Sequence, residues 1–423
     1  MTAGTYGPRI CCLDLDTFFV SVERVLDPSL EGRPVIVGGR PGTRGVVTAA
    51  SYEVRRSGVH SGMSLTRAAA LAPDAVYLPG RRGEYSEYSR RVVEIVQRFS
   101  PVVRTASIDE MFIDFRGLER LYCSPDDASA DHTIERTVRR LAETIRDELG
   151  LPASAGIATT RTVAKIASGL AKPAGVLLVP RGHEPRMLAP LPVRKFPGIG
   201  KVAAQELSRR QIHTLGDLMQ VSRTTLDDVF GAWAGHVASG LRGEGRADLG
   251  RDRPAFFEHD RDGDSVGSIS NERTFFVDEG DESIIAAMLC SLAERVAWRA
   301  RKRGVKARTI GLKLRYADFT TLTRSRTISP TDAEPDVLHA VTELYTQAKS
   351  RPLPVRLLGV SLSNLTPADQ LDLFPQRAQL HNAVDVLRAR YGFDAVRLAS
   401  GRPTKQASQS DRPPTRRPGR RPE

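Results

Sequence analysis

Two apolar stretches of the sequence carry closely spaced carboxylates. The segment RICCLDLDTFFVSVE contains Asp14 and Asp16, and the segment RTASIDEMFIDF contains the adjacent Asp109 and Glu110. Burying carboxylates in a sheet is costly unless a cation or hydrogen bonds compensate them. Either motif alone is more typical of a capping or salt-bridged carboxylate. Together, in a basic chain, they predict a hard-cation site with oxygen ligands, for Mg²⁺ or Mn²⁺.

The spacing of these acids limits how they can meet one ion. Asp14 and Asp16 lie two residues apart and share one face of a strand, whereas Asp109 and Glu110 point to opposite faces of a regular strand. Both of the latter can reach one ion only if the strand ends or bends there. Such sites, together with phosphate-binding cations, are typical of two-metal phosphoryl transfer.

Two further segments offer phosphate-binding residues. SYEVRR contains Tyr52 and Arg55, and AKIASGLAKPAG contains Lys165 and Lys172. An arginine can hold a triphosphate in a bidentate manner, and a lysine neutralises it as a point charge. The alternative is that these cations lie on solvated loops.

The composition indicates a polyanionic partner. The 423 residues predict about three domains, and the formal net charge is +12. Ten Lys or Arg and one acidic residue lie between Arg299 and Arg326, and residues 401–423 add seven basic residues against two acidic ones. Nucleic acid is therefore the leading partner.

Other classes are disfavoured. The four cysteines (Cys11, Cys12, Cys123 and Cys290) have neither CxxC pairing nor zinc spacing. No secretory signal and no run of 18 apolar residues is visible, which predicts a cytoplasmic protein without a membrane segment.

Strand and helix patterns alternate in the first 180 residues, which predicts an α/β or α+β architecture. RICCLDLDTFFVSVE is apolar on both faces, as expected for a central strand covered by helices, and RTASIDEMFIDF is also expected to be a strand. Helices are expected in SLTRAAALA after the cap Ser61, in YSEYSRRVVEIVQRF, and in TIERTVRRLAETIRDELG up to Gly150.

The second half of the chain contains a small helical segment and a further α+β domain. Residues 192–241 are helical in pattern, and strands in the later domain alternate with helices at Glu282–Arg303 and Glu334–Lys349. The stripe Leu380, Val384, Leu387 and Tyr391 predicts one more amphipathic helix, packed back on the protein.

Five motifs, in their order and separations, resemble those of a Y-family translesion DNA polymerase of the DNA polymerase IV (DinB) branch. They are LDLDTFFVSVE, SYEVRRSGV, ASIDEMFID, GIATTRTVAKIASGLAKPAG and FPGIG. The resemblance extends from about Arg9 to Leu365. The resemblance implies an α+β multidomain, right-hand polymerase with palm, fingers and thumb plus a C-terminal little finger. The implied ranges are palm, 1–16 and 81–180; fingers, 17–80; thumb with a helix-hairpin-helix, 181–245; linker, 246–267; little finger, 268–366; clamp-binding motif and helix, 367–400; disordered basic tail, 401–423.

The resemblance also implies the catalytic residues. Asp14, Asp109 and Glu110 resemble the metal-binding carboxylates, with the Leu15 carbonyl as a further ligand of two Mg²⁺ ions, Mn²⁺ being an alternative. It implies no ligand role for Asp16, for which a structural contact is expected. The function implied is low-fidelity, template-directed extension of primers past damaged bases, because the short glycine-rich fingers form a loose roof over the templating base.

The residues implied to bind deoxynucleoside triphosphates are Phe18, Phe19, Tyr52, Arg55 and Lys172. Phe19 matches the steric gate, where a ring beneath the sugar would collide with a 2′-hydroxyl, whereas Phe18 fits an ordinary core residue better. The sequence departs from the family in one place. The hydroxyl residue that the family often has three places before the tyrosine is Ala49, so a triphosphate contact is lost or shifted.

Contacts to primer-template DNA are expected from six residues. These are Ser107 near the primer terminus, Gly198, Gly200 and Lys201 in the helix-hairpin-helix segment FPGIGK, and Arg324 and Arg326 on one face of a little-finger strand. The alternative for FPGIGK is a tight turn.

The segment QLDLF resembles the peptide by which bacterial polymerases hold the sliding clamp. Its anchors would be Gln370, Leu371, Leu373 and Phe374, and the alternative is a loop docked on the little finger. The enzyme is expected to act as a monomer.

Two competing functions remain. The first is a non-catalytic, polymerase-like scaffold that binds DNA and the clamp, but such relatives are expected to lose the metal carboxylates retained here. The second is a plain nucleic-acid-binding protein, which leaves the acidic strands unexplained.

Overall fold

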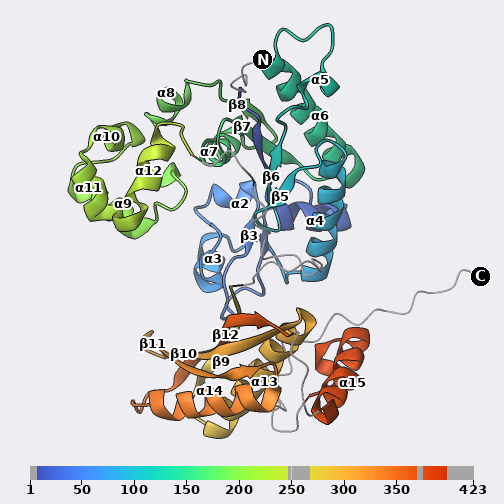
Figure 1. Cartoon of the computed structure of the whole chain (residues 1–423), viewed down its shortest axis with the longest axis vertical. Helices are drawn as coiled ribbons and strands as arrows, with labels where there is room; N and C mark the ends of the chain where they lie inside the picture. The colour runs from blue at the N-terminus through green and yellow to red at the C-terminus, as the bar shows by residue number, and fades with distance from the viewer. Residues whose placement is uncertain (1–6, 246–248, 250–266, 369–374, 398–423) are drawn as a thin grey trace, which may run out of the picture. The chain divides into compact units, whose positions relative to one another are not determined.

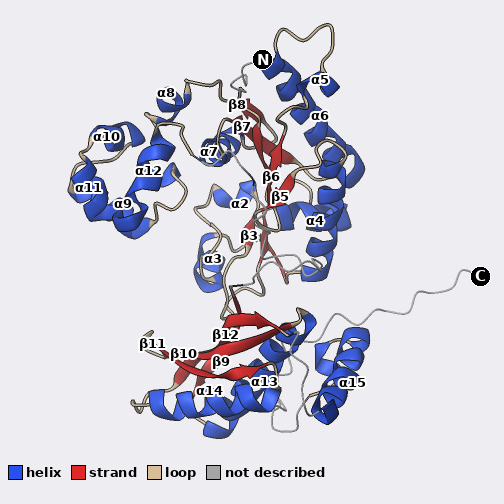
Figure 2. Cartoon of the chain, viewed as in Figure 1, coloured by secondary structure: helices blue, strands red, loops and turns tan. Residues whose placement is uncertain are grey.

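The computed structural model describes residues 7–245, 249, 267–368 and 375–397. The chain divides into two compact units, Met1–Phe257 and Glu258–Glu423, and each is described by itself. Figure 1 labels the helices and strands of both units, and Figure 2 distinguishes them by type. Both units combine helices with mostly antiparallel sheets, in agreement with the α+β prediction.

A five-stranded sheet with the order β5-β6-β1-β7-β8 lies at the centre of the first unit. Its strands are β1 (Ile10–Leu15), β5 (Val103–Thr105), β6 (Glu110–Asp114), β7 (Ala153–Ala158) and β8 (Val176–Leu178). Strand β1 is antiparallel to both of its neighbours, β6 and β7. It is therefore the central strand, as its apolar sequence predicted.

Helices cover both faces of this sheet (Figure 1). Leu13 and Leu15 pack in one core with α1 (Phe18–Leu26), α4 (Arg82–Gln97) and α6 (Ala130–Leu149). On the opposite face, Ile10 and Cys12 pack with α7 (Arg161–Ala171) and with the helical segment that follows it. The segment between α4 and α6 also holds the short helix α5 (Glu119–Tyr122).

Two predictions of local structure were wrong. RTASIDEMFIDF is a hairpin of two strands, β5 and β6, joined by a turn that includes Asp109. The segment RICCLDLDTFFVSVE is strand β1 followed by helix α1, because the chain turns at Asp16 and Thr17, the latter with a φ of 44°. The alternation of apolar residues alone could not locate either turn.

A second, three-stranded sheet with the order β3-β2-β4 carries a small core of its own. Its elements are β2 (Val35–Val37), β3 (Ala49–Ala50), α2 (Tyr52–Arg55), α3 (Leu65–Leu71) and β4 (Val76–Leu78). Helix α3 is capped by the Ser64 side chain, which accepts a hydrogen bond from the Arg67 amide. The predicted cap, Ser61, was therefore wrong by three residues.

The helical segment after β8 contains five short helices. They are α8 (Glu184–Leu188), α9 (Lys201–Arg209), α10 (Leu215–Gln220), α11 (Arg223–Phe230) and α12 (Ala234–Leu241). They share the core formed on the α7 face of the large sheet. This agrees with the helical pattern predicted for 192–241.

The second unit contains a four-stranded antiparallel sheet with the order β11-β10-β12-β9. Its strands are β9 (Ser268–Glu279), β10 (Val305–Tyr316), β11 (Thr321–Thr331) and β12 (Val355–Pro367). Helices α13 (Glu282–Lys302) and α14 (Glu334–Ala348) pack on one face of this sheet and share its core (Figure 2). The opposite face carries neither of these helices.

Helix α15 (Pro375–Tyr391) confirms the predicted helix, but the predicted packing of its apolar stripe on the protein was wrong for Leu387 and Tyr391, which are exposed. Two ionic contacts instead hold the helix to the rest of the second unit. Asp385 pairs with Arg301 of α13 (2.7 Å), and the Arg388 side chain is 1% exposed. Its guanidinium donates to Glu334 Oε1 (2.6 Å) on α14 and to Glu294 Oε1 (3.0 Å) on α13.

We expect Arg388→Ala to reduce the free energy of unfolding of the second unit by about 3–5 kcal/mol, because it removes the cation that faces two buried carboxylates. Arg390→Ala is the matched control, since Arg390 lies on the same helix and is exposed. Denaturant-induced unfolding measures both variants. Equal losses for the two would show that the buried ionic contact does not anchor α15.

Candidate active site

Asp14 and Glu110 face each other across neighbouring strands. The register pairs Asp14 of β1 with Glu110, the first residue of β6, and directly opposed residues on adjacent strands lie on the same face of a sheet. Asp109 lies in the turn just before β6, where its carbonyl accepts a hydrogen bond from the Leu15 amide (2.9 Å). Strand β6 thus begins between Asp109 and Glu110, which satisfies the condition that the strand end or bend there. Both carboxylates can therefore reach one ion.

Each carboxylate has its own partner in this structure. Lys165 of α7 forms an ion pair with Glu110, Lys172 pairs with Asp14, and the Ser107 hydroxyl donates to Asp109. Gly156 of β7 lets α7 pack this closely, because a Cβ there would lie 2.1 Å from the Ala164 carbonyl oxygen.

Burial raises the pKa of Asp14 to about 6, although the hydrogen bond from Lys172 opposes the shift. For Lys165, burial favours the neutral form, but the hydrogen bond and charge of Glu110 outweigh it and raise the pKa. Lys165 therefore remains cationic and compensates Glu110, a carboxylate that would otherwise be costly to bury.

The donor set fits hard divalent cations, because it consists of carboxylate oxygens from two adjacent strands at one edge of the sheet. Within residues 7–245, 249, 267–368 and 375–397, no three metal-binding side chains converge on one point as they stand. The cause is visible in the contacts, since each carboxylate is turned toward the partner just described.

Asp16 has the structural role expected of it. It is buried, and its carboxylate accepts hydrogen bonds from the Ser154 hydroxyl (2.8 Å), the Ala174 amide (2.7 Å) and the Tyr52 hydroxyl (3.3 Å). Asp16 Oδ1 also lies 3.8 Å from Lys172 Nζ. Through these hydrogen bonds Asp16 connects β7, α2 and the segment after α7 close to Asp14. Sequence reasoning missed Ser154, because a small residue in an apolar strand carries no signal of such a contact.

Tyr52 and Arg55 lie on the short helix α2, whose first turn is capped by Ser51. The Arg55 guanidinium lies over the Tyr52 ring at 5.1 Å, and its Nε donates to the Ala50 carbonyl (3.0 Å). Tyr52 in turn contacts Asp16, which is close to Lys172. The structure therefore brings three of the predicted triphosphate-binding residues, Tyr52, Arg55 and Lys172, together beside Asp14. Ala49 is in strand β3, two residues before the Ser51 cap.

The two phenylalanines at the start of α1 differ in exposure. Phe18 is 3% exposed and lies in the core of the large sheet, so its side chain is not accessible and a nucleotide could contact only its backbone. Phe19 is partly buried, and its ring packs against the edge of the same core. Only Phe19 therefore has a side chain available to a nucleotide sugar.

In the helix-hairpin-helix segment, the two glycines differ. Gly198 has a φ of +96°, and a Cβ there would lie 2.3 Å from the Trp233 ring, so packing and backbone conformation both require glycine. Gly200 precedes α9 as its N-cap residue, and a Cβ there would meet open space. Lys201, the first residue of α9, is exposed.

Arg324 and Arg326 lie on one face of the edge strand β11, as predicted. Their cross-strand partners, Leu312 and Ile310, are core residues, so the arginines are on the helix-covered side of the sheet. Arg326 pairs with Glu343 of α14.

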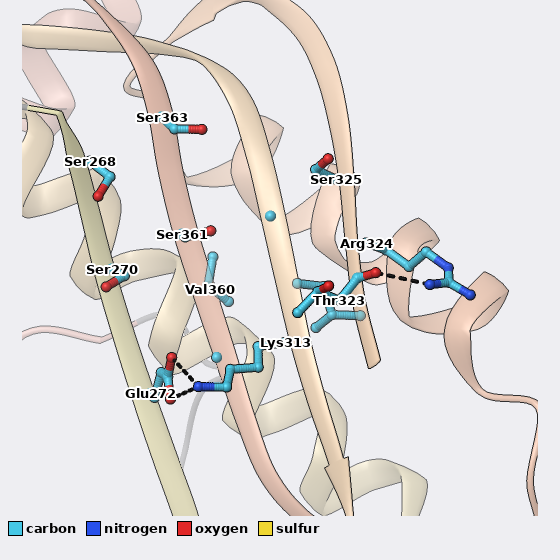
Figure 3. Close-up of a pocket in the computed structure, with 13 residues that line it drawn as sticks. Ser268, Ser270, Glu272, Lys313, Thr323, Arg324, Ser325, Val360, Ser361 and Ser363 are labelled. Carbon is cyan, nitrogen blue, oxygen red and sulfur yellow. Dashed lines mark hydrogen bonds and ion pairs between the residues drawn. The ribbon is translucent and has the colours of Figure 1, made fainter. Parts of the chain in front are cut away.

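Small polar residues form a hollow on the opposite, open face of the sheet. Figure 3 shows Ser268, Ser270, Ser361 and Ser363 along it and the Lys313–Glu272 ion pair, with the Arg324 side chain pointing away. The clamp-motif residues Gln370, Leu371, Leu373 and Phe374 lie outside the described residues.

Three family models match the chain. The profile of the impB/mucB/samB family matches residues 13–169, that of its C-terminal domain matches 266–373, and that of the IMS family HHH motif matches 181–212. These ranges contain the carboxylates Asp14, Asp109 and Glu110, the four-stranded sheet of the second unit with α13 and α14, and the FPGIGK segment, respectively.

The chain is similar to curated proteins and solved structures of one kind. It is 38% identical over 394 residues to DNA polymerase IV of Dehalococcoides mccartyi, covering 92% of this chain and 96% of the relative, and 38% identical over 378 residues to DNA polymerase IV of Streptomyces coelicolor, covering 88% and 74%. A Y-family DNA polymerase chimera of Dbh and Dpo4 superposes with a TM-score of 0.69 at 24% identity, covering 85% of this chain and 99% of the other.

The fold is therefore that of a Y-family DNA polymerase, with the multidomain right-hand architecture expected from the sequence. The chain belongs to the DNA polymerase IV family and is a DNA-directed DNA polymerase of the translesion class. No helix within its described residues is long and apolar enough to cross a membrane.

Proposed function

We propose that Asp14, Asp109 and Glu110, with the Leu15 carbonyl, form the centre at which this polymerase joins a deoxynucleotide to a primer past damaged template bases. The observation that carries the assignment is the register that sets Asp14 opposite Glu110, with Asp109 in the adjoining turn. In the reaction, the primer 3′-hydroxyl oxygen bonds to the α-phosphorus of the triphosphate while the bond to pyrophosphate breaks.

Two Mg²⁺ ions, when bound at these oxygens, would activate the 3′-hydroxyl and neutralise the pyrophosphate. Lys165 and Lys172 hold the carboxylates while the site is empty of substrate, and both remain close enough to neutralise phosphate charge after release. Tyr52 and Arg55 orient the triphosphate, Arg55 by a bidentate contact. Phe19 lies beneath the sugar and excludes a 2′-hydroxyl.

The test is primer extension on an undamaged template and on one with a bulky lesion, with Mg²⁺, with Mn²⁺ and with a chelator. We expect extension with either ion, passage across the lesion, and no extension with the chelator. Extension in the presence of the chelator would contradict the metal assignment. DNA binding without extension under every condition would favour the scaffold alternative.

The proposed domain ranges assign residues 181–245 and 268–366 to the thumb and little finger, which hold primer-template DNA. Exposed Lys201 and the α9 N-terminus at Gly200 support a phosphate contact in the thumb, and Ser107 lies beside Asp109 near the primer end. In the little finger, Arg324 and Arg326 project from an edge strand.

We expect Arg324→Ala with Arg326→Ala to weaken binding to all DNA sequences alike. Loss of two phosphate contacts should reduce the slope of log affinity against log salt by about two. Fluorescence anisotropy on several duplexes at different salt concentrations measures both effects. Glu343→Gln is the informative control, because it frees Arg326 from its ion pair and should leave affinity equal or higher. A loss confined to some sequences would contradict a backbone contact.

We also propose that the bacterial sliding clamp binds Gln370, Leu371, Leu373 and Phe374, and that the enzyme acts as a monomer in the cytoplasm. The segment follows β12, whose last residue is Pro367, and precedes α15. The alternative, a loop docked on the little finger, makes a different prediction for the same variant.

Leu373→Ala with Phe374→Ala is expected to reduce clamp affinity by about 10-fold or more, because apolar anchors dominate small interfaces. Extension with loaded clamp should fall, since tethering no longer raises the local concentration, while clamp-free extension is unchanged. Asp372→Ala, between the anchors, is the control. A parallel fall in both activities would indicate a structural loop, and no fall in either would place the clamp contact elsewhere.

A further inference from the structure

The ring of Phe19 rests on Tyr85. The two ring centroids are 4.3 Å apart and the planes differ by 19°, so the rings are stacked. Tyr85 is 1% exposed, whereas Phe19 is partly buried. Tyr85 therefore supports the inner face of the residue proposed as the steric gate.

Tyr85 is fixed in turn by a buried carboxylate. Its hydroxyl donates to Glu23 Oε1 (2.6 Å), and Glu23 is 1% exposed. Arg81 completes the set, because its Nε lies 2.9 Å from Glu23 Oε2 and its Nη2 donates to the same oxygen. Burial and the hydrogen bond to Glu23 raise the pKa of Tyr85, so the hydroxyl keeps the proton that it donates.

The four residues come from only two helices. Phe19 and Glu23 are four residues apart on α1 and so lie on the same face of that helix. Arg81 is the N-cap residue of α4, and Tyr85 lies in its first turns. The Phe19–Tyr85 stack and the hydrogen bonds of Glu23 thus connect α1 to α4.

We propose that Glu23 and Tyr85, with Arg81, are positioning residues for sugar selection, which hold the Phe19 ring where a 2′-hydroxyl would collide with it. This inference rests on the proposed role of Phe19 as the gate. A ring can exclude an extra hydroxyl only if it does not yield, and displacements of about 1 Å at a reacting site can change rates by up to about 10²-fold. None of these three positioning residues touches the substrate in this scheme.

The experiment measures kcat and KM for ribonucleotide and deoxynucleotide insertion opposite the same template base, using the full chain and primer-template DNA. Tyr85→Leu removes the stack, Tyr85→Phe removes only the hydroxyl, and Glu23→Gln removes the charge that fixes Arg81. Tyr88→Phe is the control on α4, because Tyr88 packs against the same core, whereas the side chains that donate hydrogen bonds to Glu23 are Arg81 and Tyr85. Thermal unfolding checks the fold of each variant.

We expect Tyr85→Leu to reduce discrimination against ribonucleotides by about 10-fold, mainly through a lower KM for the ribonucleotide, with deoxynucleotide insertion little changed. Tyr85→Phe and Glu23→Gln should give the same change, smaller in size, and they decide the matter if Tyr85→Leu does not fold. Equal losses of kcat for both sugars, with an unchanged ratio, would overturn the proposal, because a merely structural role predicts that result.

Phe19→Ala in parallel separates this inference from the proposed function. If Phe19→Ala relaxes discrimination and the Tyr85 and Glu23 variants do not, only the positioning role fails. If Phe19→Ala has no effect, the gate assignment fails and the inference with it. In the Phe19→Ala background, Tyr85→Leu should produce no further change, since the ring that it supports is gone. An additive effect there would overturn the proposal.

Discussion

Asp109→Ala with Glu110→Ala is expected to reduce primer extension to background, a loss of at least about 10³-fold. These substitutions remove two of the three carboxylates at the edge of the sheet, so Asp14 alone remains to bind two divalent cations. Binding of primer-template DNA should persist, because it depends on phosphate contacts elsewhere in the chain. Single-turnover extension and anisotropy on the same duplex separate the two effects.

The control for this experiment lies on the same strand. Asp114→Asn alters the acidic residue at the opposite end of β6, which pairs with Arg116 rather than with Lys165 or Lys172. It should extend primers nearly as well as the unmodified chain. If the double variant retained extension, the catalytic centre would lie outside the β1–β6 edge. If it lost DNA binding as well, the fold would have been damaged.

The second large effect is expected for Phe19→Ala, which should raise ribonucleotide insertion relative to deoxynucleotide insertion by on the order of 10²-fold. The smaller side chain leaves room for the 2′-hydroxyl, while the removal of a partly buried ring leaves the rest of the core in place. The measurement is the ratio of kcat/KM for the two sugars opposite one template base.

Phe99→Ala is the matched control for the gate. Phe99 is also partly buried against the same core, but its ring stacks on Tyr122 instead of lying at the start of α1. It should change stability and leave the sugar ratio unchanged. Unchanged discrimination in Phe19→Ala would place the gate elsewhere, with Phe18 the next residue to test even though its side chain is in the core.

The sequence by itself identified the class of enzyme and most of its helices. Helix α6 ends at Gly150, as predicted, because a glycine signal acts within one turn of helix, and the structure shows this glycine in the left-handed conformation. The acidic pairs could also be located, since carboxylates in apolar segments stand out against the hydrophobic pattern. Both signals depend only on residues that are close together in the chain.

Tertiary structure decided which of these residues meet. The opposition of Asp14 and Glu110 depends on strand register, and the pairing of Lys165 with Glu110 depends on how closely α7 packs on β7. The contact between Glu23 and Tyr85 joins residues 62 positions apart. Periodicity gives the face of an element but not its partner, because partners are selected by long-range packing, which no local pattern of residues encodes.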